Sequence, residues 1–81
     1  MTARVSMIRH WIERGQERGA AYMMTWYDPL GREDYPTYHD DAESVIRLRE
    51  EAKQYDESLE EVYDLNGDIS EQIATRNNVA V

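Results

Sequence analysis

One stretch of the chain, AAYMMTWY at residues 20–27, restricts the possible folds more than any other. Its side chains are bulky and mostly apolar at both odd and even positions, and turn formers at residues 28–31 follow it. A strand with one face in water normally alternates apolar and polar residues. Because neither alternate set is polar here, the stretch predicts a strand that is buried on both faces.

Two further strands are predicted. YPTYH at residues 35–39 forms one of them, and Pro36 places it at a sheet edge or gives it a bulge, because proline has no backbone donor. Residues 56–65 allow two interpretations: the apolar spacing of the preceding helix continues through them, yet EVYDL alternates like a strand. We favour a third strand at about residues 60–65, ended by a turn in which Asn66-Gly67 takes positive φ.

Three helices are predicted from apolar spacing and caps. The first begins at a Ser6 cap, and Gly15 within it marks either an early end or a close packing contact. The second begins at a capping box formed by Asp40 and Glu43, and the third begins at an Asp68 cap. The residues expected to face the core are Ile8, Trp11 and Ile12 in the first helix and Val45, Leu48, Ala52 and Tyr55 in the second.

The predicted order of elements is helix, strand, strand, helix, strand, helix. This order indicates one α+β domain over residues 1–81, with a small three-stranded, mostly antiparallel sheet covered by helices. Residues 1–5 and 75–81 are expected to fray. The 81 residues include no cysteine, so neither a disulfide nor a thiolate metal site adds stability. A chain of this length has a small core, and a deep active-site cleft is not expected.

The chain shows neither a secretory signal nor a membrane span. Its start, MTARVSMIRHWIERG, has no long apolar run, and the longest apolar stretch, at residues 20–27, is far shorter than the roughly 20 residues that a membrane span needs. We therefore expect a soluble protein in the cytoplasm of a bacterial host.

Negative charge is the strongest feature of the composition. The net charge is −8, and residues 28–71 alone carry fifteen acids and four bases. Such a field attracts basic surfaces, although acidity also serves solubility alone. Carboxylates four apart on a helix are about 6 Å apart, so an acidic ridge can imitate a phosphate backbone. The acids expected to bind a partner are Glu33, Asp34, Asp40, Asp41, Glu43, Glu50, Glu51, Asp56, Glu57, Glu60 and Glu61.

Motifs for metal binding and catalysis do not fit. YDLNGDISE at residues 63–71 resembles a calcium loop, but neither of its two possible registers gives the required ligands and glycine. His39 beside Asp40 and Asp41 lacks converging ligands, and we interpret it as a surface histidine whose pKa the carboxylates raise. The sequence contains no phosphate loop and no nucleophile elbow. We expect neither an enzyme nor a bound metal or cofactor.

Aromatic residues on the two predicted hairpin strands suggest a sheet that stacks nucleic-acid bases. Such sheets also need a basic surface, and the segment around these rings is acidic, so direct nucleic-acid binding is not expected. Most of the rings are assigned to the core. Tyr27, Tyr35 and Tyr38 are the candidates for a protein interface, where tyrosine is enriched.

Several segments in order resemble a known family. They are Gly19-Ala20 before an apolar strand, Asp28, Glu33-Asp34-Tyr35-Pro36 followed by Tyr38, and Glu61-Val62-Tyr63-Asp64-Leu65 before a short helix. Over roughly residues 11–74 the chain resembles small phage and prophage accessory proteins of uncharacterised function. The resemblance implies no catalytic residues. By class and charge the chain also resembles acidic inhibitors of host defence, which include anti-CRISPR proteins.

Charge and resemblance together predict a non-enzymatic phage or prophage inhibitor. Its partner would be a host protein or ribonucleoprotein with a basic nucleic-acid-binding surface, and it would act as an anti-CRISPR protein by DNA mimicry, without contact to nucleic acid or membrane. Homodimer formation stays open. The alternative is an accessory module whose aromatic hairpin drives self-association or docking to another phage protein, with the acids serving solubility.

Overall fold

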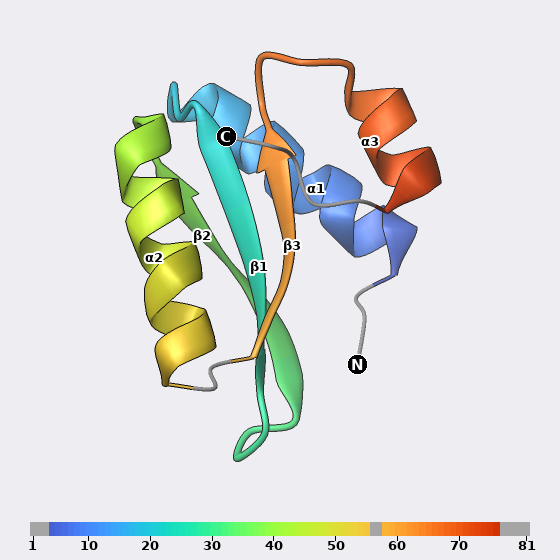
Figure 1. Ribbon diagram of the computed structural model, residues 1–81. Coiled ribbons are helices and arrows are strands. Elements are labelled where there is room, and N and C mark those ends of the chain that lie inside the picture. The colour runs from blue at the N-terminus through green and yellow to red at the C-terminus, as the bar shows by residue number, and fades with distance from the viewer. Residues whose placement is uncertain (1–3, 56–57, 77–81) are drawn as a thin grey trace.

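The fold is an open three-stranded antiparallel sheet with helices on both of its faces (Figure 1). The structure, a computed structural model, describes residues 4–55 and 58–76. The predicted α+β class and order of elements are confirmed. The elements are α1 (Val5–Glu17), β1 (Tyr22–Asp28), β2 (Glu33–His39), α2 (Ala42–Gln54), β3 (Leu59–Asp64) and α3 (Ile69–Thr75).

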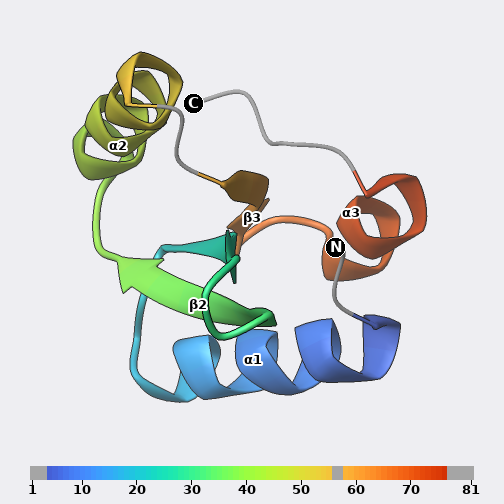
Figure 2. The same cartoon turned by 90° about the horizontal axis from the view of Figure 1, so that it is seen from below.

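Strand β1 is the central strand, which explains why its sequence is apolar at both alternate positions. The strand order is β2-β1-β3, and β1 is antiparallel to both neighbours. Met23 packs into one hydrophobic cluster with α1 and α3, while Met24 and Trp26 pack into a second cluster under α2. Figure 2 shows α2 on one side of the sheet and α1 and α3 on the other. The strand predicted to be buried on both faces is therefore confirmed.

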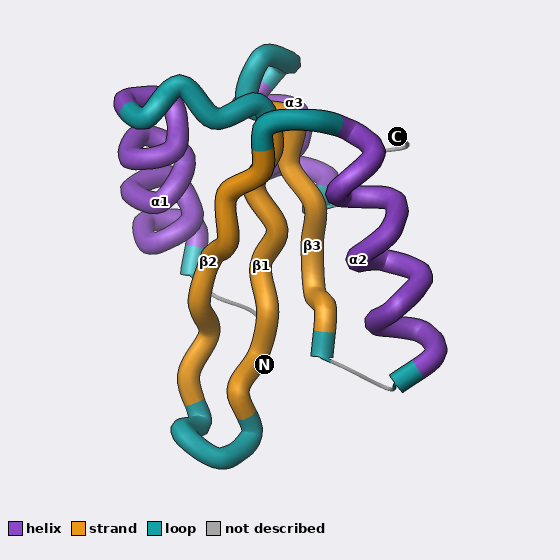
Figure 3. Tube along the Cα trace, turned by 90° about the vertical axis from the view of Figure 1, so that its left-hand side faces the viewer, coloured by secondary structure: helices purple, strands orange, loops and turns teal. Residues whose placement is uncertain are grey.

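The two outer strands also follow the predictions. Pro36 lies in β2, which is an edge strand, as its missing donor requires. Residues 59–64 form β3 rather than a continuation of α2. Strand β3 has a bulge, because Thr25 of β1 pairs with Glu61 whereas Trp26 pairs with Leu59. In Figure 3 the β1–β2 hairpin extends past the start of β3.

Two of the three predicted helix caps are wrong, each by one or two residues. Helix α1 has Arg4 at its N-cap with no side-chain cap bond, so Ser6 does not cap it. The cap of α2 is Asp41 rather than Asp40: an Asp41 carboxylate oxygen accepts a 2.8 Å hydrogen bond from the Ser44 backbone N–H. Asp68 caps α3 as predicted, with a 3.0 Å bond from the Glu71 N–H.

Gly15 marks a close packing contact and not an early helix end. It is buried inside α1, and a Cβ added there would lie 2.7 Å from Tyr38 Cε1 and 2.8 Å from Leu65 Cδ1. Gly19 has φ +75°, a left-handed conformation that ends the helix at low cost. The apolar face predicted for α1 is buried, whereas Tyr55 just after α2 is 67% exposed, so its assignment to the core of α2 is wrong.

The turn after β3 is built by Asp64 and not by a glycine with positive φ. The Asn66 N–H donates a 2.9 Å hydrogen bond to the Asp64 carboxylate, and the Gly67 N–H donates a 3.1 Å bond to the Asp64 carbonyl. Among the described residues, positive φ occurs at Gly19, Arg32 and Arg76. The prediction of positive φ at Asn66-Gly67 is therefore wrong.

Helix α3 covers part of the outer edge of β3 through one side chain. The Gln72 amide accepts a 2.8 Å hydrogen bond from the Asp64 N–H and donates a 2.9 Å bond to the Asp64 carbonyl. These are the two groups that a fourth strand would use at this position. The contact therefore occupies the outward-facing backbone groups of the last residue of β3, which could otherwise form hydrogen bonds with a strand of another chain.

The ends of the described chain are ordered further than the sequence predicts. Val5 is the first residue of α1 and Thr75 is the last residue of α3. Residues 1–3 and 77–81, which complete the segments expected to fray, lie outside the described residues. Within the described part, no helix has the length and apolar character of a membrane span.

Candidate partner-binding surface

Strands β2 and β3 end at the same edge of the sheet, and acidic residues follow both. Each strand is antiparallel to β1, so the two are parallel to each other, and Tyr22 of β1 pairs with His39 on one side and with Asp64 on the other. Two neighbouring strand spacings put these ends about 10 Å apart. The residues gathered here, which we call the acidic edge, are Asp40, Asp41, Glu43, Asp64 and Asp68.

The acidic edge faces solvent, and three of its carboxylates also hold local structure. Asp64 is half-buried, and the other four residues are exposed. Asp41, Asp64 and Asp68 each accept a hydrogen bond from a backbone N–H through one oxygen. The hydrogen bonds from Ser44 lower the pKa of Asp41, which keeps it ionised. Asp40 and Glu43 have no such capping role, so they can be changed without removing a cap.

Sequence reasoning missed Asp64 and Asp68 as members of this surface. It assigned Asp64 to the third strand and Asp68 to the cap of the third helix, and it gave neither residue a role in binding. Only the register across β1 brings them beside the predicted residues Asp40 and Asp41. An available signal was the antiparallel order itself: two edge strands flanking one central strand must end on the same side of the sheet.

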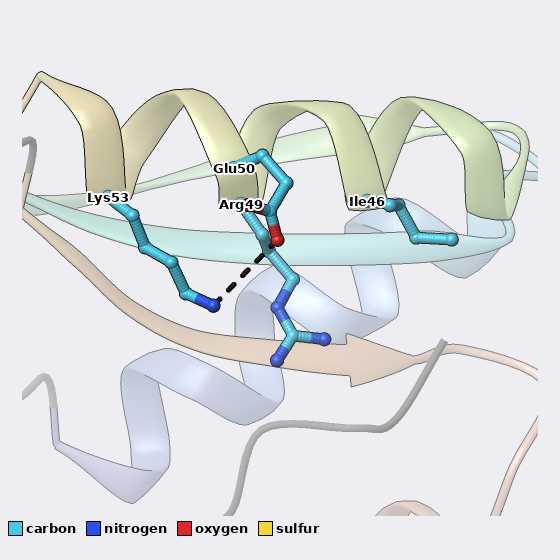
Figure 4. Close-up of a pocket in the computed structure, with 4 residues that line it drawn as sticks. All are labelled: Ile46, Arg49, Glu50 and Lys53. Atoms are coloured by element: carbon cyan, nitrogen blue, oxygen red, sulfur yellow. Dashed lines mark ion pairs between the residues drawn. The ribbon is translucent and has the colours of Figure 1, made fainter.

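The predicted ridge along α2 is not uniformly acidic. Helix α2 carries three acids and three bases, so its formal charge is zero. Lys53 Nζ lies 3.7 Å from Glu50 Oε1 in an exposed ion pair. Figure 4 shows the Arg49 side chain extending beside this pair over a hollow of about 180 Å³, lined by Ile46, Arg49, Glu50 and Lys53. Glu50 thus lies beside two cations of its own helix, and Glu51 is half-buried.

Glu61 is part of the interior and not of the surface. It is 5% exposed, and Arg76 holds it with bonds of 2.7 Å from Nε and 3.1 Å from Nη2. The Tyr63 hydroxyl donates a further 2.9 Å bond to Glu61 Oε1. Burial, followed by the contact with Glu61, raises the pKa of Tyr63, so its hydroxyl stays protonated. These contacts tie the end of α3 to β3.

The remaining predicted acids lie at the opposite end of the sheet or outside the described part. Glu33 is exposed at the start of β2, while Asp34 and Glu60 are half-buried at the starts of β2 and β3. Asp56 and Glu57 lie outside the described residues. The eleven predicted acids therefore do not form one continuous ridge.

The three candidate interface tyrosines do not share a face of the sheet. Tyr35 lies opposite Trp26 on the α2 side and is 43% exposed. Tyr38 packs on the α1 side, where its hydroxyl donates a 2.7 Å bond to the Trp11 carbonyl and Arg18 stacks 4.8 Å from the ring centroid. Tyr27 is half-buried and, by the alternation of β1, points to the α1 side. Among these three, Tyr35 alone is exposed, whereas Tyr27 and Tyr38 are half-buried.

His39 is half-buried, and the predicted direction of its pKa shift is wrong. Burial lowers the pKa of His39, and this effect outweighs the opposite influence of Asp40 and Asp41. Trp26 Nε1 donates a 2.8 Å hydrogen bond to Thr37 Oγ1, which lies 2.8 Å from His39 Nε2. The Thr37 hydroxyl can then donate to the ring nitrogen of a neutral imidazole, so the contact favours the uncharged form.

Over residues 4–55 and 58–76, no group of three or more histidine or carboxylate side chains is arranged to hold a metal ion. Comparison of the chain with protein-family models, with curated proteins and with solved structures finds no match.

Proposed function

We propose that the protein is a non-enzymatic inhibitor whose acidic edge binds a basic surface. That surface would be the nucleic-acid-binding site of a host defence complex, which the protein would occupy as an anti-CRISPR protein by DNA mimicry. The observation that carries the proposal is the convergence of Asp40, Asp41, Glu43, Asp64 and Asp68 at one solvent-facing edge. The resemblance to phage and prophage accessory proteins is the reason for proposing a bacterial host as the source of the partner.

Electrostatics explains why this edge suits such a partner better than α2 does. Four exposed carboxylates and one half-buried carboxylate lie at or just beyond two strand ends about 10 Å apart. Capping hydrogen bonds hold three of these acids in fixed positions, so binding orders fewer side chains. Clustered like charges raise the association rate with a basic partner and make binding sensitive to salt.

A matched pair of double variants tests the proposal. Asp40→Asn with Glu43→Gln removes two charges from the acidic edge. The hydrogen bonds from backbone N–H groups to the other three carboxylates stay in place. Glu13→Gln with Glu17→Gln removes two charges from exposed positions of α1. The tagged proteins are used in a pull-down from bacterial lysate, with elution by a salt gradient and competition by duplex DNA.

We expect a nucleic-acid-binding complex to be retained by the unchanged protein, to elute at moderate salt and to be displaced by DNA. The acidic-edge variant should elute at lower salt, with affinity reduced by roughly tenfold for two lost contacts, while the α1 variant behaves like the unchanged protein. Equal elution of both variants, or retention of no such complex, would refute the proposal.

A second candidate function is self-association or docking through the hairpin. Leu30 at the hairpin tip is 96% exposed, and Tyr35 on β2 is 43% exposed, so two large apolar side chains face solvent there. The affinity of an interface formed by these two side chains would increase or stay constant as the salt concentration rises. The same salt gradient therefore distinguishes it from the electrostatic proposal.

A further inference from the structure

The end of the sheet opposite the acidic edge holds two carboxyl oxygens that have no hydrogen-bond donor among the described residues. Asp34 Oδ1 and Glu60 Oε1 are both shielded from solvent, and neither accepts a hydrogen bond within residues 4–55 and 58–76. Asp34 is the second residue of β2, and Glu60 is the second residue of β3. Two ionised carboxylates buried side by side without donors would repel each other and lose hydration.

Strand geometry brings the two groups together across β1. Asp34 pairs with Tyr27, which places it on the α1 side of the sheet. The bulge in β3 inserts Glu60 before Glu61, and a bulge of this kind turns two neighbouring side chains to the same side. The carboxyl groups of Asp34 and Glu60 are within hydrogen-bonding reach of one another. Without the bulge, strict alternation would put Glu60 on the α2 side.

We propose that Asp34 and Glu60 share one proton at neutral pH, and that this proton joins the starts of β2 and β3 across β1. Its loss would leave two negative charges in a half-buried position and loosen this end of the sheet. A carboxyl group that keeps its proton can donate a hydrogen bond to a neighbouring carboxylate. This one hydrogen bond satisfies both of the shielded oxygens.

The charged groups around the pair favour retention of the proton. On β3, Glu61 adds negative charge, but Arg76 at the end of α3 already neutralises it. On β1 the facing groups are the Tyr27 ring and the buried Thr25, neither of which carries charge at neutral pH. Burial, and then the contact with Asp34, raises the pKa of Glu60 to about 7.

Urea unfolding between pH 5 and pH 8.5 tests the proposal. Glu60→Gln and Asp34→Asn each replace one member of the pair with a neutral amide of similar shape, and Glu50→Gln makes the same change at an exposed position. Relative to Glu60→Gln, the unfolding equilibrium constant of the unchanged protein should rise about 10- to 100-fold over this range. Glu50→Gln should retain the profile of the unchanged protein. Superimposable profiles for the unchanged protein and Glu60→Gln would overturn the proposal.

Two measurements on the unchanged protein do not depend on the folding of a variant. Carbon-13 NMR of the side-chain carboxyls should show one group that titrates close to neutral pH, and titration of every carboxyl below pH 5.5 would overturn the proposal. Hydrogen exchange should show lower protection of the Tyr27 amide, which bonds the Ser58 carbonyl at 2.9 Å, above neutral pH than below it. Constant protection would also count against the shared proton.

A bound cation is the competing explanation, because two carboxylates could share a divalent ion in place of a proton. Millimolar Mg²⁺ or Ca²⁺ should leave the stability of the unchanged protein at pH 8 unaltered. A stabilisation that Glu60→Gln lacks would assign the site to the cation and overturn the proton.

Discussion

At the scale of single residues, Gly15 shows how one position can join two elements. It is buried in α1 where a side chain would meet the ring of Tyr38 and the methyl group of Leu65. Because the α1 backbone comes so close at this point, the Tyr38 hydroxyl reaches the Trp11 carbonyl one helical turn earlier. The sequence offered close packing as one of two interpretations of this glycine, and it could not decide because the contacting residues are more than twenty positions away.

His39 carries a prediction about pH. Its pKa is lower in the folded protein than in the unfolded chain, so the folded form binds fewer protons just below pH 6.5. The stability contributed by this residue is present above pH 6.5 and is lost as pH falls through the folded pKa. NMR titration should give a midpoint below 6.5 for His39, and Thr37→Val should raise that midpoint by removing the 2.8 Å partner. A midpoint above 6.5 in the unchanged protein would contradict this account.

At the scale of elements, the type of each segment could be predicted from the sequence better than its ends. Asp40 and Asp41 are both good capping residues, and only the backbone conformation selects Asp41, so the cap was misplaced by one position. Tyr55 continues the apolar spacing of α2, yet it lies beyond the last helical residue and turns outward. Local propensity identifies the elements, whereas tertiary geometry sets where they end.

Gln72 gives an element-scale prediction, because its amide occupies the outer edge of β3. Gln72→Ala removes both hydrogen bonds to the Asp64 backbone and should cost about 1 to 3 kcal/mol of unfolding free energy. Gln54→Ala, at an exposed position at the end of α2, is the matched control and should change stability by less than about 0.5 kcal/mol. Urea unfolding measures both changes, and hydrogen exchange should show faster opening at the Asp64 amide in Gln72→Ala alone. Equal stability of the two variants would refute the edge role of Gln72.

At the scale of the whole molecule, the antiparallel sheet with helical cover was predictable, but the arrangement of its charges was not. The apolar run of β1 and the edge proline of β2 are local signals that require no knowledge of register. The acidic edge arises only when β2 and β3 end together on either side of β1. Glu61 was assigned to the surface because its partner, Arg76, lies fifteen residues further along the chain.

The pair formed by Glu61 and Arg76 links the end of the described chain to the sheet, and it supplies a whole-molecule prediction. Arg76→Ala would leave a 5% exposed carboxylate without its cation and should cost about 2 to 4 kcal/mol. Lys53→Ala breaks an ion pair whose side chains are 74% and 70% exposed, and it should change stability by less than about 0.5 kcal/mol. Thermal or urea unfolding measures the loss of stability in both variants. Similar losses in Arg76→Ala and Lys53→Ala would contradict this prediction.

The strand order β2-β1-β3 also fixes a sequence of events during synthesis. Strands β1 and β2 are joined by a short turn and can pair as soon as both have left the ribosome, whereas β3 follows only after the whole of α2. Until Leu59–Asp64 emerges, β1 keeps one open edge, and Met24 lacks its cross-strand partner Val62. The nascent chain is therefore most vulnerable to aggregation in the interval between completion of the hairpin and arrival of β3.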